Sequence, residues 1–396
     1  MTDHKQLPAD EDKSILIMQL LKTLFLSVIS VWAVSRPALT VSVSSNLQHV
    51  LDDDTTCLSP NIVTGVYDNP PKIVVHNACK GDIWTWTHYD AQRHMYKESD
   101  DVFKCLSNGN SATEVKWVAE REWILAIYGN AAIIVNYSDK QLVFAVCLND
   151  NSHSLELVPD DKLALATTSH TLQGSIKIFD CAQNNSLPIQ ELHLLPACHA
   201  LVWDEHDQTL WAVGNDKPPS GNYGKSYGIL NGYQYDKRKG QFRQAVLDTH
   251  RVTEAALLLE EWTDADYAGW WDGPHDVIPI PNERKLLITT DRDIHIFDIT
   301  NGSFEHGDAV MQKYLPGFQP VDHRTGRNGV LLPRSDLKAV SINANRDVIY
   351  VQSDWRSWSS SHVNLLVDGA KKPDINFSGI IYRSRWMDEV SGWPAA

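Results

Sequence analysis

Three histidines begin similar segments of the chain, and they are the residues best suited to chemistry. His153, His199 and His275 each precede a short apolar stretch, a polar turn and a second apolar stretch. Lys338 begins a weaker copy of the same pattern. Side chains of this kind at equivalent places can bind a metal, transfer protons or donate hydrogen bonds to an oxygen that gains charge. We expect catalytic residues among these four, while histidines that only brace neighbouring elements by hydrogen bonds would give the same pattern.

The sequence around these residues does not favour a bound metal or an organic cofactor. The histidines lack a local ligand pair such as HxH or HExxH, and the cysteines form no CxxC pair. We therefore expect no metal and no cofactor at the site.

Aromatic, acidic and basic residues precede His275 and Lys338 and are candidates for binding a substrate. The loop WTDADYAGWWDGPHD ends at His275, and VDHRTGRNGVLLPR lies shortly before Lys338. Indole rings offer stacking walls, and arginines neutralise carboxylate or enolate groups. The alternatives are a packed loop for the first segment and a solvated surface loop for the second. The substrate-binding candidates are Trp262, Trp270, Trp271, Asp272, Arg324 and Arg327.

The segments that begin at these residues predict β-hairpins. Apolar residues alternate in short runs bounded by Gly, Pro, Asn and Asp, which is typical of strands. Further strands follow some hairpins, as in GSIKIFD near residue 174, RDIHIFDIT near 292 and YGILNGYQYD near 227. The predicted hairpins cover residues 153–169, 199–215 and 275–291, with weaker copies at 115–130 and 338–354 and a half-unit at 73–90.

Repetition at this period predicts an all-β chain folded as a β-propeller. We expect six blades, or seven if residues 375–386 form a blade of their own. Ring closure needs a terminal strand to complete a blade begun at the other end, and residues 38–45 are the candidate. Residues 36–396 then form one domain, with an insertion around 215–272 in which EAALLLEEW forms a short helix.

The N-terminal residues have the features of a signal segment for export. Residues 15–35 are apolar except for Lys22, and initiation at Met18 would give a basic start, an apolar core and small residues before a cleavage site. An uncleaved anchor, which would place the chain at a membrane, is the alternative for residues 1–35. We expect a secreted or lumenal glycoprotein, with sequons at Asn136, Asn184, Asn301 and Asn376.

An even number of cysteines in an exported chain favours disulfides, although the sequence does not determine the pairing. The candidates are Cys57, Cys79, Cys105, Cys147, Cys181 and Cys198. The net charge of -15 argues against nucleic acid as a partner. The 14 Trp and 13 Tyr residues suit pockets for apolar or aromatic small molecules, beyond those that fill cores.

The segments at the three histidines also resemble an uncharacterised family of secreted propellers of bacteria and fungi, over roughly residues 70–355. Its bacterial pattern reads HS-x-x-x-LPDG, HGV-x-WD and GHDL-x-P, which His153-Ser154, His199 and His275-Asp276 match. Asp161 and Ala200 stand where the pattern has glycine. The chain is similar in organisation to the fungal hetero-Diels-Alderases of tropolone sesquiterpenoid biosynthesis, which join an o-quinone methide to a humulene-type alkene. This resemblance implies a secondary-metabolism cyclase, but it assigns no catalytic residue.

Two other classes of function fit the residues. A carbohydrate-active propeller, either a polysaccharide lyase or a glycosidase, would use a histidine to take a proton beside a uronate carboxylate. A non-catalytic binding propeller is the third class, because a fold does not fix a function.

Overall fold

The structure is a computed structural model that describes residues 61–94, 100–168, 174–193, 195–260, 269–326, 329–354 and 357–394. These residues belong to one compact unit, Asp54–Ala396. Over the described ranges the strands form five antiparallel sheets. The prediction of an all-β fold is thereby confirmed.

Three of the sheets have four strands in sequence order, and a fourth has five. The first contains β4 (Ala112–Val118), β5 (Trp123–Tyr128), β6 (Ala131–Asn136) and β7 (Leu142–Cys147). The second contains β8 (Ser152–Val158), β9 (Lys162–Thr167), β10 (Ser175–Asp180) and β11 (Gln190–His193). The third contains β12 (Ala200–Asp204), β13 (Thr209–Asn215), β14 (Gly228–Asp236), β15 (Gln241–Phe242) and β16 (Asp248–Arg251). The fourth contains β17 (Pro274–Pro279), β18 (Lys285–Thr290), β19 (Ile294–Asp298) and β20 (Ser303–His306).

The fifth sheet joins the C-terminal strands to the first described strands. It contains β21 (Leu337–Ile342), β22 (Val348–Gln352), β23 (Ser360–Val367), β24 (Ala370–Trp386), β1 (Ile62–Tyr67), β2 (Lys72–Asn77) and β3 (Gly81–Trp86). The long strand β24 pairs with β23 along its first part and with β1 from Ile380 to Trp386. The C-terminal strand therefore completes a sheet whose other strands are N-terminal, which removes one open edge. The candidate closing strand at residues 38–45 lies outside the described residues.

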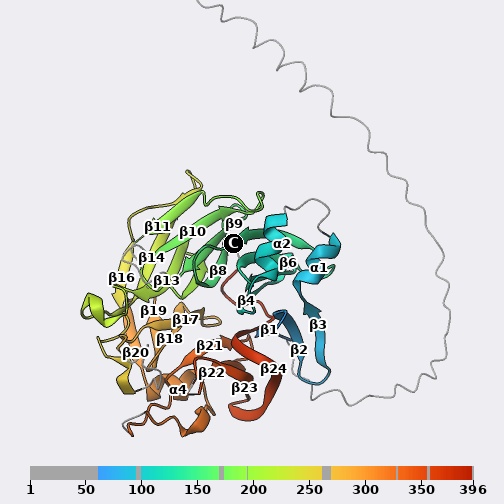
Figure 1. Ribbon diagram of the computed structural model, residues 1–396. Helices are drawn as coiled ribbons and strands as arrows, with labels where there is room; N and C mark the ends of the chain where they lie inside the picture. Colours follow the sequence, from blue (N-terminus) through green and yellow to red (C-terminus); the bar gives the residue numbers. More distant parts are fainter. Residues whose placement is uncertain are drawn as a thin grey trace, which may run out of the picture. The chain divides into compact units, whose positions relative to one another are not determined.

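The first strand of each sheet lies toward the centre of this unit. β4 contacts β8, and further contacts follow in the order β12, β17, β21 and β24, which in turn contacts β4. Figure 1 shows β4, β8, β17 and β21 near the middle, and β3, β11, β16 and β20 toward the outside. The predicted hairpins are thus confirmed as strand pairs, and the residues that begin them come together near the centre.

Strands such as β5 are nearly continuous apolar runs and do not show the alternation expected from the sequence, because both of their faces are buried. Along β5, Ile124 and Ala126 pack in one cluster with Val63 and Trp86, which come from β1 and β3. The alternate residues Leu125 and Ile127 pack in another cluster, which includes residues of β8 and β9. Each sheet of this kind is a middle layer between two others, as in a propeller.

The helices of the described segments are short and peripheral to the strands: α1 (His88–His94), α2 (Asp100–Ser107) and α4 (Asp308–Tyr314). Single 3-10 turns occur at Ala119–Arg121, Gly221–Tyr223, Leu258–Glu260 and Val321–His323. The helix predicted within EAALLLEEW is only such a turn over its described part. No helix among the described residues is long and apolar enough to span a membrane.

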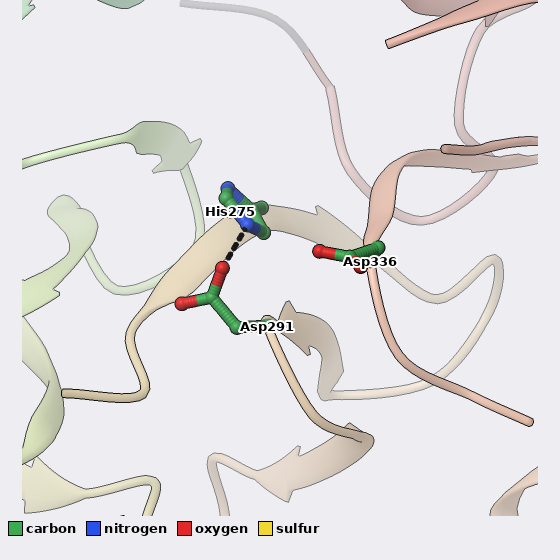
Figure 2. A group of neighbouring side chains, drawn as sticks. All are labelled: His275, Asp291 and Asp336. Atoms are coloured by element: carbon green, nitrogen blue, oxygen red, sulfur yellow. Dashed lines mark hydrogen bonds and ion pairs between the residues drawn. The ribbon is translucent and has the colours of Figure 1, made fainter. Parts of the chain in front are cut away.

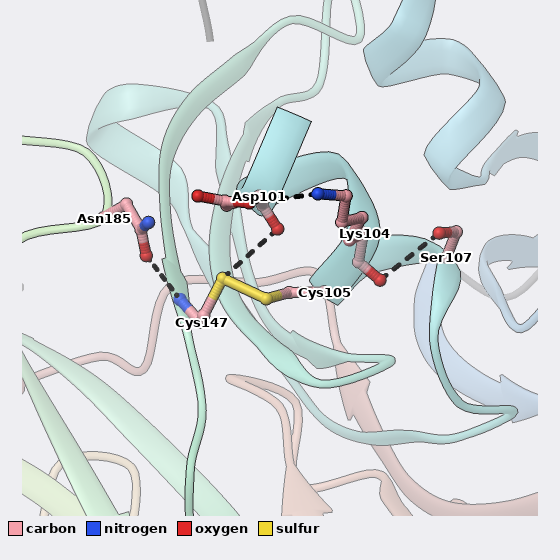
Figure 3. Close-up of a disulfide and its surroundings, with 6 residues drawn as sticks. All are labelled: Asp101, Lys104, Cys105, Ser107, Cys147 and Asn185. Atoms are coloured by element: carbon pink, nitrogen blue, oxygen red, sulfur yellow. Dashed lines mark hydrogen bonds and ion pairs between the residues drawn. A yellow bond between two sulfur atoms is a disulfide. The ribbon is translucent and has the colours of Figure 1, made fainter. Parts of the chain in front are cut away.

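A disulfide between Cys105 and Cys147 ties α2 to the end of β7 (Figure 3). Cys79 is also disulfide-bonded, with a partner outside the described residues, where Cys57 lies too. Cys181 and Cys198 are free thiols, so the expectation of disulfides at these two positions is wrong. Cys198 is completely buried among apolar side chains, where it serves as a small core residue.

The insertion predicted around residues 215–272 is in part a regular piece of the third sheet. β14 pairs with β13 over seven residues, and β15 and β16 both pair with β14. The added part consists of the segments before and after these strands, which are joined by bridges from Ser220 to Trp270 and from Leu257 to Trp271. The apolar N-terminal segment, residues 15–35, lies outside the described residues.

Candidate functional site

A cavity of about 600 Å³ lies where the central strands begin, and all three candidate histidines line it. His153, His275 and Lys338 each lie where the pairing of the innermost strand with its neighbour shifts register. His199 directly precedes β12. A bulge of this kind redirects a side chain. Residues that are equivalent in the sequence repeat therefore occupy nearly equivalent places around one opening.

The imidazole rings of the three histidines form a cluster around Tyr382. The ring centroids of His153 and His199 are 4.8 Å apart, and those of His199 and His275 are 5.5 Å apart. The ring of Tyr382 lies 5.3 Å from His153 and 6.5 Å from His275. The sequence repeat did not include Tyr382, which comes from the C-terminal part of β24.

The environment keeps His153 and His199 neutral. Burial lowers the pKa of His199 to about 3, and His275 nearby adds to the shift. Burial also holds the pKa of His153 well below its usual value, with further contributions from His199 and Arg383. Nδ1 of His199 lies 2.7 Å from the carbonyl oxygen of Ala197, which can only accept, so Nδ1 carries the proton. Nε2 of His199 is consequently a hydrogen-bond acceptor.

His275 has polar partners at both ring nitrogens. Its Nε2 lies 2.7 Å from Oδ1 of Asp291 (Figure 2) and 2.7 Å from Nζ of Lys338. Its Nδ1 lies 3.2 Å from the hydroxyl of Tyr382. Burial alone would raise the pKa of Asp291, but His275 and Lys338 outweigh it and hold that pKa below its usual value. Asp291 is thus a carboxylate that orients the imidazole.

Asp336 completes a buried group of potential metal ligands with His275 and Asp291, whose ligand atoms lie within 4.8 Å of one another. Figure 2 shows the carboxyl group of Asp336 directed toward His275. The ammonium of Lys338, however, contacts both Nε2 of His275 and, at 3.1 Å, Oδ1 of Asp336. Because this cation already neutralises the group, we assign no metal to it.

Arg324, a candidate for binding substrate, does not line the cavity. Its side chain is 1% exposed, and its guanidinium forms an ion pair with Asp336 and hydrogen bonds with Ser335. The ion pair stabilises Asp336, which in turn holds Lys338. Arg324 therefore supports the site from behind.

Two of the aromatic candidates belong to the cavity wall. Trp270 and Trp271 line it, together with Trp358, Tyr67 and Tyr382. The indole Nε1 of Trp271 and Nδ1 of His153 are buried and have no hydrogen-bond partner among the described residues. Buried polar atoms of proteins nearly always have a partner, so these two atoms suit a polar group of a ligand.

Three substrate-binding candidates remain. Asp272 is buried but does not line the cavity. Trp262 and Arg327 lie outside the described residues, so their predicted roles remain predictions. The sequons lie away from the cavity: Asn184, Asn301 and Asn376 are exposed and Asn136 is partly buried.

Below the cavity, charged side chains fill the centre of the ring. Arg383 contacts Glu114 at 2.5 Å and the carbonyl oxygen of His199 at 2.9 Å. Arg385 binds both carboxylate oxygens of Asp276, at 2.6 and 2.8 Å. This buried network closes the channel, and a smaller cavity of about 160 Å³ lies at the other ends of the same strands. The histidine cavity is therefore a pocket with a floor, open at one side of the ring.

The ring of antiparallel sheets and its central cavity define the class of protein as a β-propeller. The chain matches the model of a family of unknown function, designated DUF6528, over residues 20–220. Since this match covers half of the chain, the protein belongs to that family. No curated protein matches it by sequence.

Solved structures with some likeness include propeller domains. The β-propeller domain of Cps50 (Swd1) from Myceliophteria thermophila is 13% identical over 81% of each chain, with a TM-score of 0.43. A chain of the Kuenenia stuttgartiensis hydrazine synthase is 9% identical over 74% of this chain and 70% of its own, with a TM-score of 0.45. A chain of the mitotic checkpoint complex is 12% identical over 90% and 92%, with a TM-score of 0.44. At these values the assignment of architecture rests on the sheets themselves.

Proposed function

We propose that this protein is an enzyme of the hetero-Diels-Alderase type that joins an o-quinone methide to an apolar alkene in the histidine cavity. The observation that carries the proposal is the convergence of three imidazoles and the Tyr382 phenol on one aromatic-walled pocket. The similarity in general organisation to the fungal hetero-Diels-Alderases supports the choice of reaction.

The size and walls of the cavity suit two apolar partners held side by side. Its volume of about 600 Å³ lies within the usual range for pockets that bind small molecules. Three tryptophans, Trp270, Trp271 and Trp358, offer flat apolar surfaces to an aromatic ring and a terpene chain. Holding two reactants in register supplies the orientation that a cycloaddition needs, without covalent participation of the protein.

The polar atoms of the wall suit the oxygen of the heterodiene. A carbonyl that gains negative charge in the transition state is stabilised by donors placed beforehand in a site with little water. The hydroxyl of Tyr382 and the indole N–H of Trp271 are such donors. Buried cations and carboxylates beneath the pocket are matched, as in the pairs of Arg383 with Glu114 and Lys338 with Asp336, so a neutral carbonyl suits it better than a strongly charged ligand.

A lyase acting on a uronate-containing glycan is the second candidate. The contact between His275 and Tyr382 favours it, because such a pair can take a proton from carbon beside a carboxylate. The cation nearest to the pocket, Lys338, is already held by Asp336, which leaves the substrate carboxylate without a clear partner in the described part of the wall. The cyclase is therefore the better account.

We also propose six blades. Each of the four sheets that begin with β4, β8, β12 and β17 corresponds to one blade. The fifth sheet divides at β24, because the first part of this strand belongs with β21 to β23 and its last part belongs with β1 to β3. An experimental structure that contains the complete ring tests this count directly.

Passage through the secretory route is proposed from the disulfides and the surface position of most sequons. Disulfides persist in oxidising compartments, and Cys105 is paired with Cys147. Expression in a fungal host should give a chain that begins near Arg36 and loses mass on deglycosylation. Recovery of an unmodified chain with Met1 intact from the cytosol would contradict this proposal.

The activity is tested by adding the purified protein to a hydroxymethyl tropolone, as precursor of the quinone methide, and a humulene-type alkene. We expect faster adduct formation and one enantiomer in excess, compared with heat-inactivated protein. A Trp271→Ala variant should lower the enantiomeric excess because it removes part of the wall. A racemic product at the uncatalysed rate would reject the cyclase, and cleavage of a polyuronate would favour the lyase. If the protein binds the ligand but shows neither activity, it is a binding propeller.

A further inference from the structure

We propose that Tyr382 is the group that exchanges protons with the ligand, and that His275 sets the direction of the exchange through competition between Asp291 and Lys338. This inference rests on the cavity described above and deepens the proposed function, since it assigns a proton-transfer residue to it. It also defines the ligand class: molecules with an acidic enol or phenol hydroxyl, such as the precursor of a quinone methide.

The first observation is that three side chains form a continuous line from the protein interior to the cavity. Asp291 contacts Nε2 of His275 at 2.7 Å, and Nδ1 of the same ring contacts the hydroxyl of Tyr382 at 3.2 Å. Asp291 and His275 are held in the fold by β17, β18 and the backbone N–H of Gly273, which donates to Asp291. Tyr382 lines the cavity. A proton can move along this line in hydrogen-bonded steps.

The second observation is that Nε2 of His275 has two competing partners. A ring nitrogen either donates one hydrogen bond or accepts one, in a single in-plane direction. Asp291 requires the proton to be on Nε2, whereas the ammonium of Lys338, 2.7 Å away, requires Nε2 to accept. Only one of these two hydrogen bonds is satisfied at a time.

The two arrangements reverse the hydrogen bond to Tyr382. When Nε2–H donates to Asp291, Nδ1 of the neutral ring accepts from the hydroxyl of Tyr382, whose oxygen can then take a proton from the ligand. When Lys338 donates to Nε2, Nδ1 carries the proton and donates to the oxygen of Tyr382, whose own O–H is free to face the cavity. The same tyrosine can thus act as a base or as an acid.

The proton balance of the base direction is simple. The hydroxyl proton of the ligand passes to the oxygen of Tyr382 while the original Tyr382 proton passes to Nδ1 of His275. The products are a ligand anion and a His275 imidazolium held against the Asp291 carboxylate. In the acid direction, the Tyr382 proton passes to a ligand oxygen, Nδ1 returns a proton to Tyr382, and Lys338 supplies one to Nε2. The ligand gains one proton and Lys338 becomes a neutral amine.

The other groups around the relay have fixed roles that leave His275 as its centre. Burial keeps His153 and His199 neutral by lowering the pKa of each. Arg383 is engaged by Glu114 and by backbone carbonyl oxygens, including that of His275. Asp336 is held by Arg324 and by Lys338. Burial raises the pKa of Tyr382, so its hydroxyl keeps its proton until a partner exchanges it.

The test uses 4-nitrophenol as the probe, because its ionised form absorbs visible light and its neutral form does not. The probe is added to the full chain at a pH one unit below the pKa of the free probe. We expect the wild-type protein to bind it largely as nitrophenolate. Tyr382→Phe and His275→Gln should bind it with the ionised fraction reduced about tenfold or more, in line with the loss of a positioned proton carrier.

Tyr350→Phe is the matched control. Its hydroxyl is also buried, but it donates to the carbonyl oxygen of Gln319 and does not line the cavity. This variant should ionise the probe as the wild type does, and thermal melts of all variants report whether each is folded. An unchanged ionised fraction in folded Tyr382→Phe, or binding of only the neutral probe by the wild type, would overturn the inference. If the wild-type protein ionises the probe but does not catalyse the cycloaddition, the proposed function is rejected and the role of Tyr382 in proton exchange is not.

Discussion

Nζ of Lys338 lies 2.7 Å from Nε2 of His275, and both side chains are buried where β21 and β17 begin. The two residues are 63 positions apart in the chain. They meet because each occupies a bulge at the equivalent place of its own hairpin. Lys338 thus connects the imidazole cluster to the ion pair of Asp336 with Arg324.

Removal of this lysine should destabilise the fold as well as the site. Lys338→Met leaves the buried carboxylate of Asp336 with Arg324 as its cation, and we expect a loss of about 1–3 kcal/mol in the free energy of unfolding. Lys177→Met is the control, since Lys177 pairs with the exposed Asp150 and should cost less than about 1 kcal/mol. Urea denaturation of both variants compares them. Equal losses would show that Lys338 is not held as the structure indicates.

The charged residues that form the floor of the cavity should contribute more to the free energy of unfolding than Lys338 does. Arg383 and Glu114 are both fully buried, and Glu114→Gln leaves the buried guanidiniums of Arg383 and Arg385 to share the one carboxylate of Asp276, which should cost about 3–5 kcal/mol. Arg346→Gln, which removes an exposed partner of Glu283, should change stability by less than about 1 kcal/mol. A Glu114→Gln variant with the wild-type melting temperature would contradict the burial of this pair.

The free energy of unfolding should also decrease as the pH is lowered, because of His199. Its pKa is about 3 in the folded protein against 6.5 in the unfolded chain, so the unfolded state binds the extra proton between these values. The contribution is complete above pH 6.5 and is lost as the pH falls, by about 1.4 kcal/mol per pH unit. His199→Gln should therefore show a shallower dependence than the wild type between pH 6.5 and pH 5, measured by urea denaturation. Identical slopes would mean that the ring is protonated in the folded protein.

The thiol chemistry follows from the disulfide assignment. Alkylation in denaturant without reductant should label Cys181 and Cys198 and leave Cys79, Cys105 and Cys147 unmodified. In the native protein Cys181 should react slowly, because burial raises the pKa of its thiol to about 12. Peptide mass spectrometry identifies the labelled positions. Labelling of Cys105 would contradict the disulfide with Cys147.

The parts of the site that the sequence predicted are those encoded by local repeats. His153, His275 and Lys338 begin hairpins of similar pattern, and a repeated hairpin places equivalent residues around one centre. Tyr382 could not be found in this way, because the strand that carries it completes a sheet with β1 and lies 107 residues from His275 in sequence. The sequence predicted that residues 375–386 belong to a blade, but not that Tyr382 lies at the centre of the ring.

Arg324 shows a different limit. A basic residue in a polar loop is usually exposed, and only the buried carboxylate of Asp336 explains why this one is inside. The strands β15 and β16 were likewise missed and taken as part of an insertion, because β15 has only two residues and β16 is short and polar, so neither shows the alternation that marks longer strands. The position of Arg324 and the pairing of β15 and β16 both depend on contacts with residues distant in the sequence, which the local pattern does not show.

The most direct test of the account measures adduct formation by His153→Ala, His199→Ala and His275→Ala, with and without a chelator, together with a thermal melt of each. We expect at least one folded variant to form product about 10- to 1000-fold more slowly, as is usual for loss of one oriented donor or proton carrier, with no effect of the chelator. Variants that melt earlier but keep full turnover per folded molecule would show that the histidines only brace the strands. Three folded variants with wild-type rates would contradict a catalytic role for this cavity.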